Sequence, residues 1–183
     1  GTGRTTCGYF YDHDQRVLFA STHLAGDSCP PRPDYSKGYV WPVYEGYDIF
    51  TAKPDGSDLR RLTDAPGYDA EATLSTDGQW VVFFADRKLK KIAVTGGSAV
   101  TLAEVPNLLG GSWTEDGTIV AALNNPTGLW RVPAAGGKPE PLTTLAEGEV
   151  THRRPQVLPG GKAVLFTSNS RLSFYEDANL IVQ

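Results

Sequence analysis

Gly-rich turns recur along the chain with a period of about 40 residues. In one series each turn precedes an apolar run, and these runs are residues 81–84, 119–122 and 163–166. A second series interleaves with the first, and its turns are residues 54–57, 95–98 and 135–138. β-prone segments flank the turns of both series, and Gly supplies the positive φ that a tight hairpin needs. Two phased series with one period predict a repeated unit of four short antiparallel strands.

A four-stranded unit of this length is typical of a β-propeller blade. The predicted fold class is therefore all-β: a β-propeller of four-stranded antiparallel blades, about four of them in 183 residues. We expect a single unit over residues 1–183, with blades at 4–63, 68–104, 107–145 and 150–183. The first blade carries an insertion at residues 24–46, and the last blade is expected to lack its outer strand. Long helices are disfavoured, because 20 Gly and 13 Pro are spread along the chain.

Charge and hydropathy argue against two classes of partner. A net charge of −4 and an isoelectric point near 5.3 are not typical of nucleic-acid-binding proteins, which usually carry a basic surplus. No window approaches about 18 uninterrupted apolar residues, so no membrane insertion is expected. No signal peptide is visible and Met is absent, also at position 1, so we expect a processed, excised or engineered chain.

Three segments of the first two blades, residues 47–63, 66–69 and 75–78, resemble the WD40-like (PD40-type) repeats of TolB-type β-propellers. In the later blades, residues 128–137 and 152–156 are similar to propellers attached to some bacterial serine/threonine kinases. The resemblance covers nearly the whole chain, and it implies a propeller fold and an extracytoplasmic location, periplasmic or secreted. Such blades serve as interaction scaffolds, sensor domains and gating domains of peptidases, so the resemblance leaves the function open.

The sequence lacks the motifs of common enzyme classes. It contains no G-x-S-x-G nucleophile elbow, no H-E-x-x-H zinc motif and no G-x-x-x-x-G-K phosphate loop. The oxygen-rich segment 12–14 lies in the first turn of the first blade, where Asp is a common turn former. We therefore predict no catalytic residue, no cofactor and no metal ligand.

Alignment of the repeats indicates one candidate site. The first strand of each blade lines the central channel of a propeller, so equivalent residues of these strands gather around one mouth. Counting back from the turns makes four polar residues equivalent in pairs: Asp69 and Glu71 with His152 and Arg154. The third blade contributes Leu108 and Gly110, and the first contributes Thr6 and Gly8. The acidic and basic groups either bind a polar ligand or partner segment, or they are compensating charges that organise the mouth.

The insertion is the second candidate site for a partner. It is rich in aromatic residues, whose rigid side chains make good anchors at protein interfaces. The four that we single out are Tyr35, Tyr39, Trp41 and Tyr44. We expect this loop to bind a protein or peptide partner in addition to the channel mouth.

Two cysteines leave the redox state open. A disulfide between Cys7 and Cys29 would close a loop towards the insertion and would suit an oxidising compartment. Two separate thiols are the alternative, because a sequence does not show whether the Cβ atoms meet. A zinc site is disfavoured, since the two residues lack the paired spacing of zinc motifs.

The leading functional hypothesis is a non-enzymatic propeller scaffold that contacts a protein or ligand through its channel mouth and its insertion. The alternatives are a fragment of a larger enzyme, either the gating propeller of a serine peptidase or the sensor propeller of a kinase, and an engineered or chimaeric half-propeller. For the assembly we favour a homodimer that completes a ring of about eight blades. The other possibility is a closed four-blade monomer in which residues 1–5 supply the missing strand.

Overall fold

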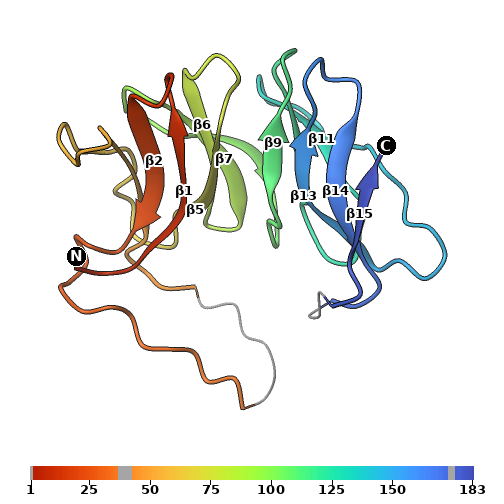
Figure 1. Cartoon of the computed structure of the whole chain (residues 1–183), viewed down its shortest axis with the longest axis horizontal. Helices are drawn as coiled ribbons and strands as arrows, with labels where there is room; N and C mark the ends of the chain where they lie inside the picture. Colours follow the sequence, from red (N-terminus) through yellow and green to blue (C-terminus); the bar gives the residue numbers. More distant parts are fainter. Residues whose placement is uncertain (1, 37–42, 173–175) are drawn as a thin grey trace.

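The computed structural model describes residues 2–36, 43–172 and 176–183, and it contains four antiparallel sheets (Figure 1). Each sheet is one blade, and its strands are adjacent in chain order. Blade 1 comprises β1 (Thr5–Tyr11), β2 (Arg16–Ser21), β3 (Asp48–Ala52) and β4 (Arg60–Arg61). Blade 2 comprises β5 (Ala70–Leu74), β6 (Trp80–Ala85), β7 (Lys88–Ala93) and β8 (Val100–Glu104). Blade 3 comprises β9 (Gly111–Trp113), β10 (Thr118–Ala121), β11 (Trp130–Pro133) and β12 (Glu140–Pro141). Blade 4 comprises β13 (Thr151–Val157), β14 (Val164–Asn169) and β15 (Asn179–Val182).

These sheets confirm the all-β propeller, and within the described residues the last blade has three strands, as expected. The insertion of blade 1 lies between β2 and β3, as expected from the sequence. In the described part of the chain, no helix is long and apolar enough to cross a membrane.

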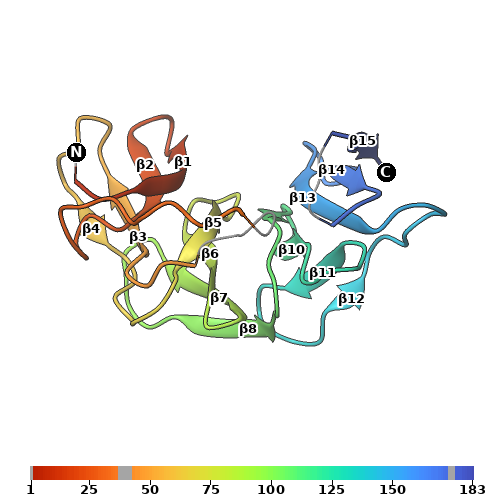
Figure 2. The same cartoon turned by 90° about the horizontal axis from the view of Figure 1, so that it is seen from below.

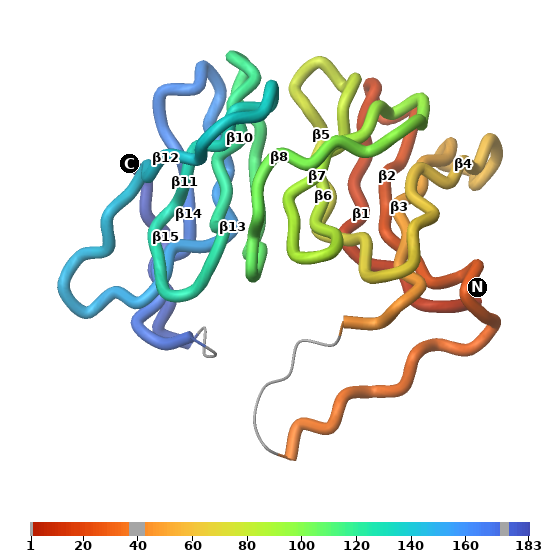
Figure 3. Tube along the Cα trace, turned by 180° about the vertical axis from the view of Figure 1, so that it is seen from behind, coloured from red at the N-terminus to blue at the C-terminus, as the bar shows by residue number. Residues whose placement is uncertain are grey.

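The four blades follow one another along an open arc, which is clearest from below (Figure 2). The inner strands β1, β5, β9 and β13 contact one another in that order. None of the strands β1–β4 contacts any of β13–β15, so among the described residues the arc does not close on itself. The view from behind shows the same separation between the first and last blades (Figure 3).

The turns between the first two strands of blades 2 and 3 use one hydrogen-bonded device. In blade 2, the Asp77 carboxylate accepts the Ser75 hydroxyl at 2.6 Å and the Gln79 amide at 3.0 Å. In blade 3, Asp116 accepts the Thr114 hydroxyl and the amide of Thr118. Gly78 and Gly117 follow these aspartates with φ of 68° and 80°, a conformation that Gly adopts without steric cost. The Gly-rich turns that precede the apolar runs 81–84 and 119–122 are therefore hairpin turns.

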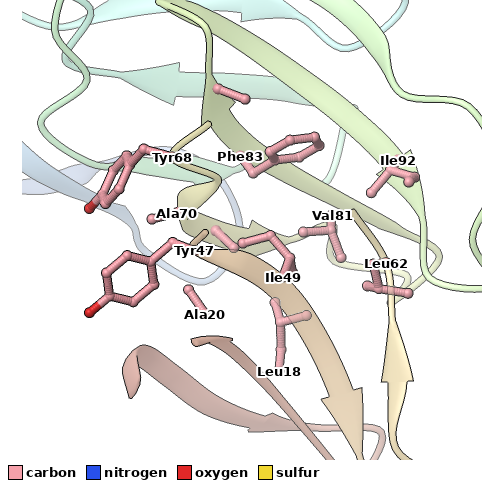
Figure 4. Packing of buried hydrophobic residues seen from close by; sticks show 12 residues of the cluster. Leu18, Ala20, Tyr47, Ile49, Leu62, Tyr68, Ala70, Val81, Phe83 and Ile92 are labelled. Carbon is pink, nitrogen blue, oxygen red and sulfur yellow. The ribbon is translucent and has the colours of Figure 1, made fainter. Parts of the chain in front are cut away.

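The hydrophobic core lies between blades rather than inside any one of them. Leu18 and Ile49 of blade 1 pack against Val81, Phe83 and Ile92 of blade 2 (Figure 4). A second cluster joins blades 2 and 3, and a third joins blades 3 and 4. Burying two sheet faces against each other removes apolar surface from water, which is the main stabilising term in such a fold.

The strand register predicts that truncation of Trp113 is costly. The sequence places Trp80, Trp113 and Trp130 in strands; in the structure Trp113 is buried at 7% exposure, and the other two are half-buried. Trp113→Ala should therefore lower the free energy of unfolding by about 3–5 kcal/mol, measured by urea denaturation. Val100→Ala, at an exposed position of β8, should change it by less than about 0.5 kcal/mol. An unchanged midpoint for Trp113→Ala would contradict the register.

Candidate functional site

At an equivalent position of each blade, one residue has a left-handed backbone conformation. This residue lies within the inner strand or directly before it. These residues are Cys7, Glu71, Gly110 and Arg154, with φ of 51°, 54°, 100° and 50°. In blades 1, 2 and 4 the residue lies in a β-bulge, where the pairing of the first two strands shifts register. A bulge of this kind bends the strand and redirects a side chain. The four blades thus repeat one backbone irregularity at the same level of the inner strands.

A pocket of about 390 Å³ lies at these bulges, and all four blades contribute to it. Its lining residues are Cys7, Tyr9, Glu71, Ala72, Thr73, Gly110, Gly111, Ser112, Arg154, Pro155 and Gln156. The pocket carries one carboxylate and one guanidinium, together with a thiol and several hydroxyl groups. Of the predicted mouth residues, Glu71 and Arg154 are brought together here.

The charged pair gives the pocket its electrostatic character. Burial raises the pKa of Glu71, while the Cys7 thiol, which donates to Oε1 at 3.7 Å, and the Arg154 guanidinium oppose that rise. Burial and the neighbouring Glu71 also raise the pKa of Cys7. Tyr9 donates its hydroxyl to the Ala72 carbonyl at 3.0 Å, and burial raises its pKa to about 12. The pocket therefore holds neutral donors beside one acidic and one basic group.

Gly110 is required where blades 3 and 4 meet. A Cβ at this position would lie 2.9 Å from the Cα of Arg154, and φ is +100°. The amide of Arg154 donates to the Leu109 carbonyl at 2.8 Å, which fixes the two inner strands relative to each other. Close backbone approach thus places Arg154 at the pocket.

Asp69 and His152 lie between the blades, outside this pocket. Both are buried, and each binds a threonine of the preceding blade: Thr63 for Asp69, and Thr143 for His152. Thr63 and Thr143 occupy equivalent positions, and each hydroxyl also accepts a backbone amide, from Ile49 at 3.0 Å and from Leu129 at 2.8 Å. Asp69 and Glu71 are two residues apart, as are His152 and Arg154. The two side chains of each pair lie in different places because the bulge alters their orientation. The structure therefore divides the four predicted residues into a pocket pair and an inter-blade pair.

The inter-blade groups differ in electrostatics. Burial raises the pKa of Asp69 to about 6, and the nearby Asp48 adds to the rise. In blade 4, His152 Nε2 lies 2.9 Å from Oε2 of Glu149, and the Ser168 hydroxyl donates to Oε1 at 2.5 Å. These hydrogen bonds, chiefly that of Ser168, hold the pKa of Glu149 at about 2. Such fully bonded groups are typical of polar contacts that align neighbouring blades.

In the first blade, the sequence alignment of the repeats differs from the structure. In blade 1, Tyr11 and Arg16 face each other at the start of the first hairpin turn, and in blade 2 Ser75 and Trp80 do the same. Counting back four residues from Tyr11 and from Ser75 gives Cys7 and Glu71, so these two residues are equivalent. The alignment that assigned Thr6 and Gly8 to the mouth is therefore wrong by one residue. A hairpin loop counted one residue too long would produce this shift, and the repeat spacing alone does not reveal it.

The insertion residues are only partly described. Tyr44 is half-buried, donates its hydroxyl to the Pro31 carbonyl and lies under the Arg4 guanidinium, 6.0 Å from the ring centroid. Tyr35 is exposed. Tyr39 and Trp41 lie outside the described residues. A partner-binding role of this loop stays a prediction.

The two cysteines are free thiols in this structure. Cys7 contacts Glu71, and the exposed Cys29 donates to the carbonyl of Gly3 at 2.9 Å. Within residues 2–36, 43–172 and 176–183, no three His, Cys, Asp or Glu side chains are placed to hold a metal ion.

A larger pocket, of about 510 Å³, lies at the rim between blades 1 and 2. Arg16 and Arg60 line it, and both bind Asp58, at 2.7 and 3.1 Å. The segment from Tyr11 to His13 and the turn around Asp77 complete the wall. Its two arginines already share the Asp58 carboxylate, whereas the inner-strand pocket combines groups from all four blades.

No family model and no curated protein sequence matches the chain. Its fold is similar to that of TolB from Acinetobacter baumannii, with a TM-score of 0.70 and 10% identity over 98% of this chain and 41% of that chain. A gluconolactonase from Xanthomonas campestris gives 0.59 and 16% identity over 95% of this chain and 55% of that one. The C-terminal WD40 domain of Sif2 gives 0.57 and 12% identity over 98% and 42%.

The chain thus spans about half the length of the structures that it resembles. The sheet topology defines a β-propeller domain, and its fold is similar to the folds of TolB and of a WD40 domain. At such low identities the likeness concerns the fold alone.

The buried Asp69 predicts a pH-dependent gain in stability on substitution. Its pKa in the folded protein, about 6, exceeds its ordinary value, so the folded state binds the proton more tightly than the unfolded state. The stability contributed by Asp69 is therefore greatest at acidic pH and is lost as pH rises through 6. Asp69→Asn should raise the urea midpoint relative to the wild type at pH 8, and the gain should shrink by pH 4.5. Asp14→Asn, at an exposed turn position with positive φ, should leave the midpoint unchanged at both pH values.

Proposed function

We propose that this chain is a non-enzymatic β-propeller domain that binds a protein or peptide segment in the pocket at its inner strands. The observation that carries the proposal is the convergence of all four blades on one pocket with Glu71 and Arg154 in its wall. A binding domain needs a shaped concave surface with a few oriented polar groups, and this pocket provides both.

The chemistry of the pocket favours a segment that carries both signs of charge. The Arg154 guanidinium offers several donors to a carboxylate, and Glu71 accepts from a Lys or Arg side chain. The thiol of Cys7 and the hydroxyl of Ser112 lie in the same wall and suit the peptide backbone between such side chains. The exposed Tyr35 and the half-buried Tyr44 make the insertion our second proposed contact.

An extracytoplasmic location is part of this proposal, and its support is the resemblance to TolB-type propellers. The non-enzymatic character is proposed on the lack of a recognised catalytic motif in the sequence. The fold of the chain is similar to that of a gluconolactonase, and the similarity concerns the fold alone. Lactone hydrolysis is therefore one of the activities to be assayed.

The binding proposal predicts that loss of either pocket charge weakens a peptide complex. Peptides selected from a random displayed library on the immobilised domain serve as probes, and Kd is measured by calorimetry. Glu71→Gln and Arg154→Gln should each weaken binding about tenfold or more, because a hydrogen bond to a charged group contributes about 1.5–3 kcal/mol. Glu104→Gln and Arg131→Gln make the same charge changes on β8 and β11, outside the pocket, and should leave Kd unchanged. Selected peptides that bind all five proteins equally would contradict the proposed site.

The non-enzymatic assignment predicts no turnover of peptide, ester or lactone substrates above the uncatalysed rate. Product formation would be followed by chromatography with the purified wild type. Turnover that Glu71→Gln abolishes and Glu104→Gln preserves would refute the assignment and make the pocket an active site.

A further inference from the structure

Blade 4 presents to solvent a face that every other blade buries against its successor. In the strand register Leu180 pairs with Thr167 as Ile49 pairs with Ala20 and Leu89 with Phe84. Ile49 and Leu89 are 0% exposed, because each packs against the next blade, whereas Leu180 is 75% exposed. Val182 on the same strand is also exposed. This face therefore carries apolar residues at inter-blade positions, and no blade in the described part of the chain covers it.

Blade 1 presents the complementary kind of face. Phe10 occupies the position that Leu74, Trp113 and Val157 hold in the later blades, where each packs against the preceding blade. Phe10 is 59% exposed. A shallow apolar hollow of about 350 Å³ extends over the same blade and is lined by Val17, Phe19 and Leu59, among others. The equivalents of Phe19, which include Phe83 and Phe166, are buried.

Blade 4 thus exposes the kind of face that packs against a following blade, and blade 1 exposes the kind of face that packs against a preceding blade. We propose that a second copy of this chain completes the ring, with blade 1 of each copy packed on blade 4 of the other. A second copy carries both required faces, so one two-fold axis along the channel creates two identical interfaces and leaves no blade uncovered. The proposal depends on blade packing and is independent of the ligand proposed above.

Ring completion also bears on the inner-strand pocket. In the single arc the pocket is lined from the inner side of all four blades, and among the described residues β1 does not contact β13. In the proposed ring, the inner strands of the second copy complete the channel beside this pocket. The channel then contains two Glu71 and two Arg154 side chains related by symmetry.

Light scattering coupled to size-exclusion chromatography tests this assembly with the full chain at micromolar concentration. We expect a particle of twice 19.8 kDa for the wild type. Leu180→Asp and Phe10→Asp should each shift the particle to the monomer mass, because each places a carboxylate in both interfaces. Val100→Asp, which alters another exposed apolar residue, on the outer strand of blade 2, should leave the dimer intact. Thermal unfolding at dilute concentration verifies that the variants fold, since Leu180 and Phe10 are exposed within one chain.

A mixing experiment distinguishes the proposed geometry from pairing through the edges of β15. A dimer of one Leu180→Asp chain and one Phe10→Asp chain retains one unaltered interface, so the mixture should recover a dimer that neither variant forms alone. A wild type of monomer mass at every concentration would overturn the proposal. So would a Phe10→Asp variant that stays dimeric, or an assembly that grows beyond two chains, because neither fits a closed two-chain ring.

Discussion

The structure depends on the burial of blade faces against neighbouring blades. Alternate residues of β6 show the constraint: Val81 and Phe83 pack towards blade 1, whereas Val82 packs towards blade 3. A single four-stranded sheet has no core of its own, so its strands are stable only in a stack. The position of every inner strand, and with it the pocket, follows from this packing. The same constraint makes the uncovered ends of the arc the least satisfied part of the molecule.

Polar pairs at the inner rim of these interfaces keep the blades in register. Thr63 with Asp69 and Thr143 with His152 occupy equivalent positions between blades 1 and 2 and between blades 3 and 4. Between blades 2 and 3 the corresponding residues are Ala103 and Leu108, which belong to one hydrophobic cluster. At each interface the two residues of the pair therefore match each other, either by hydrogen bonding or by apolar contact. A buried group left without its partner would be costly, which favours the native order of blades.

The fold was predictable from the sequence because turns and strands recur with one period, and Gly and Asp mark the turns chemically. The equivalence of Glu71, Gly110 and Arg154 followed from the same spacing. The division of the four site residues did not, because a bulge changes which way a side chain points without changing the repeat length. Cys7 was missed as a pocket residue for a different reason: the repeat alignment of the first blade was wrong by one residue. The state of Cys29 depends on the path of the insertion, which carries no repeat signal.

The backbone at the bulges supplies an argument for the pocket that is separate from its charges. Left-handed φ costs a residue with a side chain of order 1 kcal/mol, and Gly avoids that cost. Gly110 in blade 3 shows that this geometry accommodates Gly, yet the other three blades carry Cys7, Glu71 and Arg154 there. Blade packing alone gives no reason to place a carboxylate or a guanidinium at a strained position. Both side chains line the same pocket, so the backbone cost at these two positions supports the binding role that we propose for it.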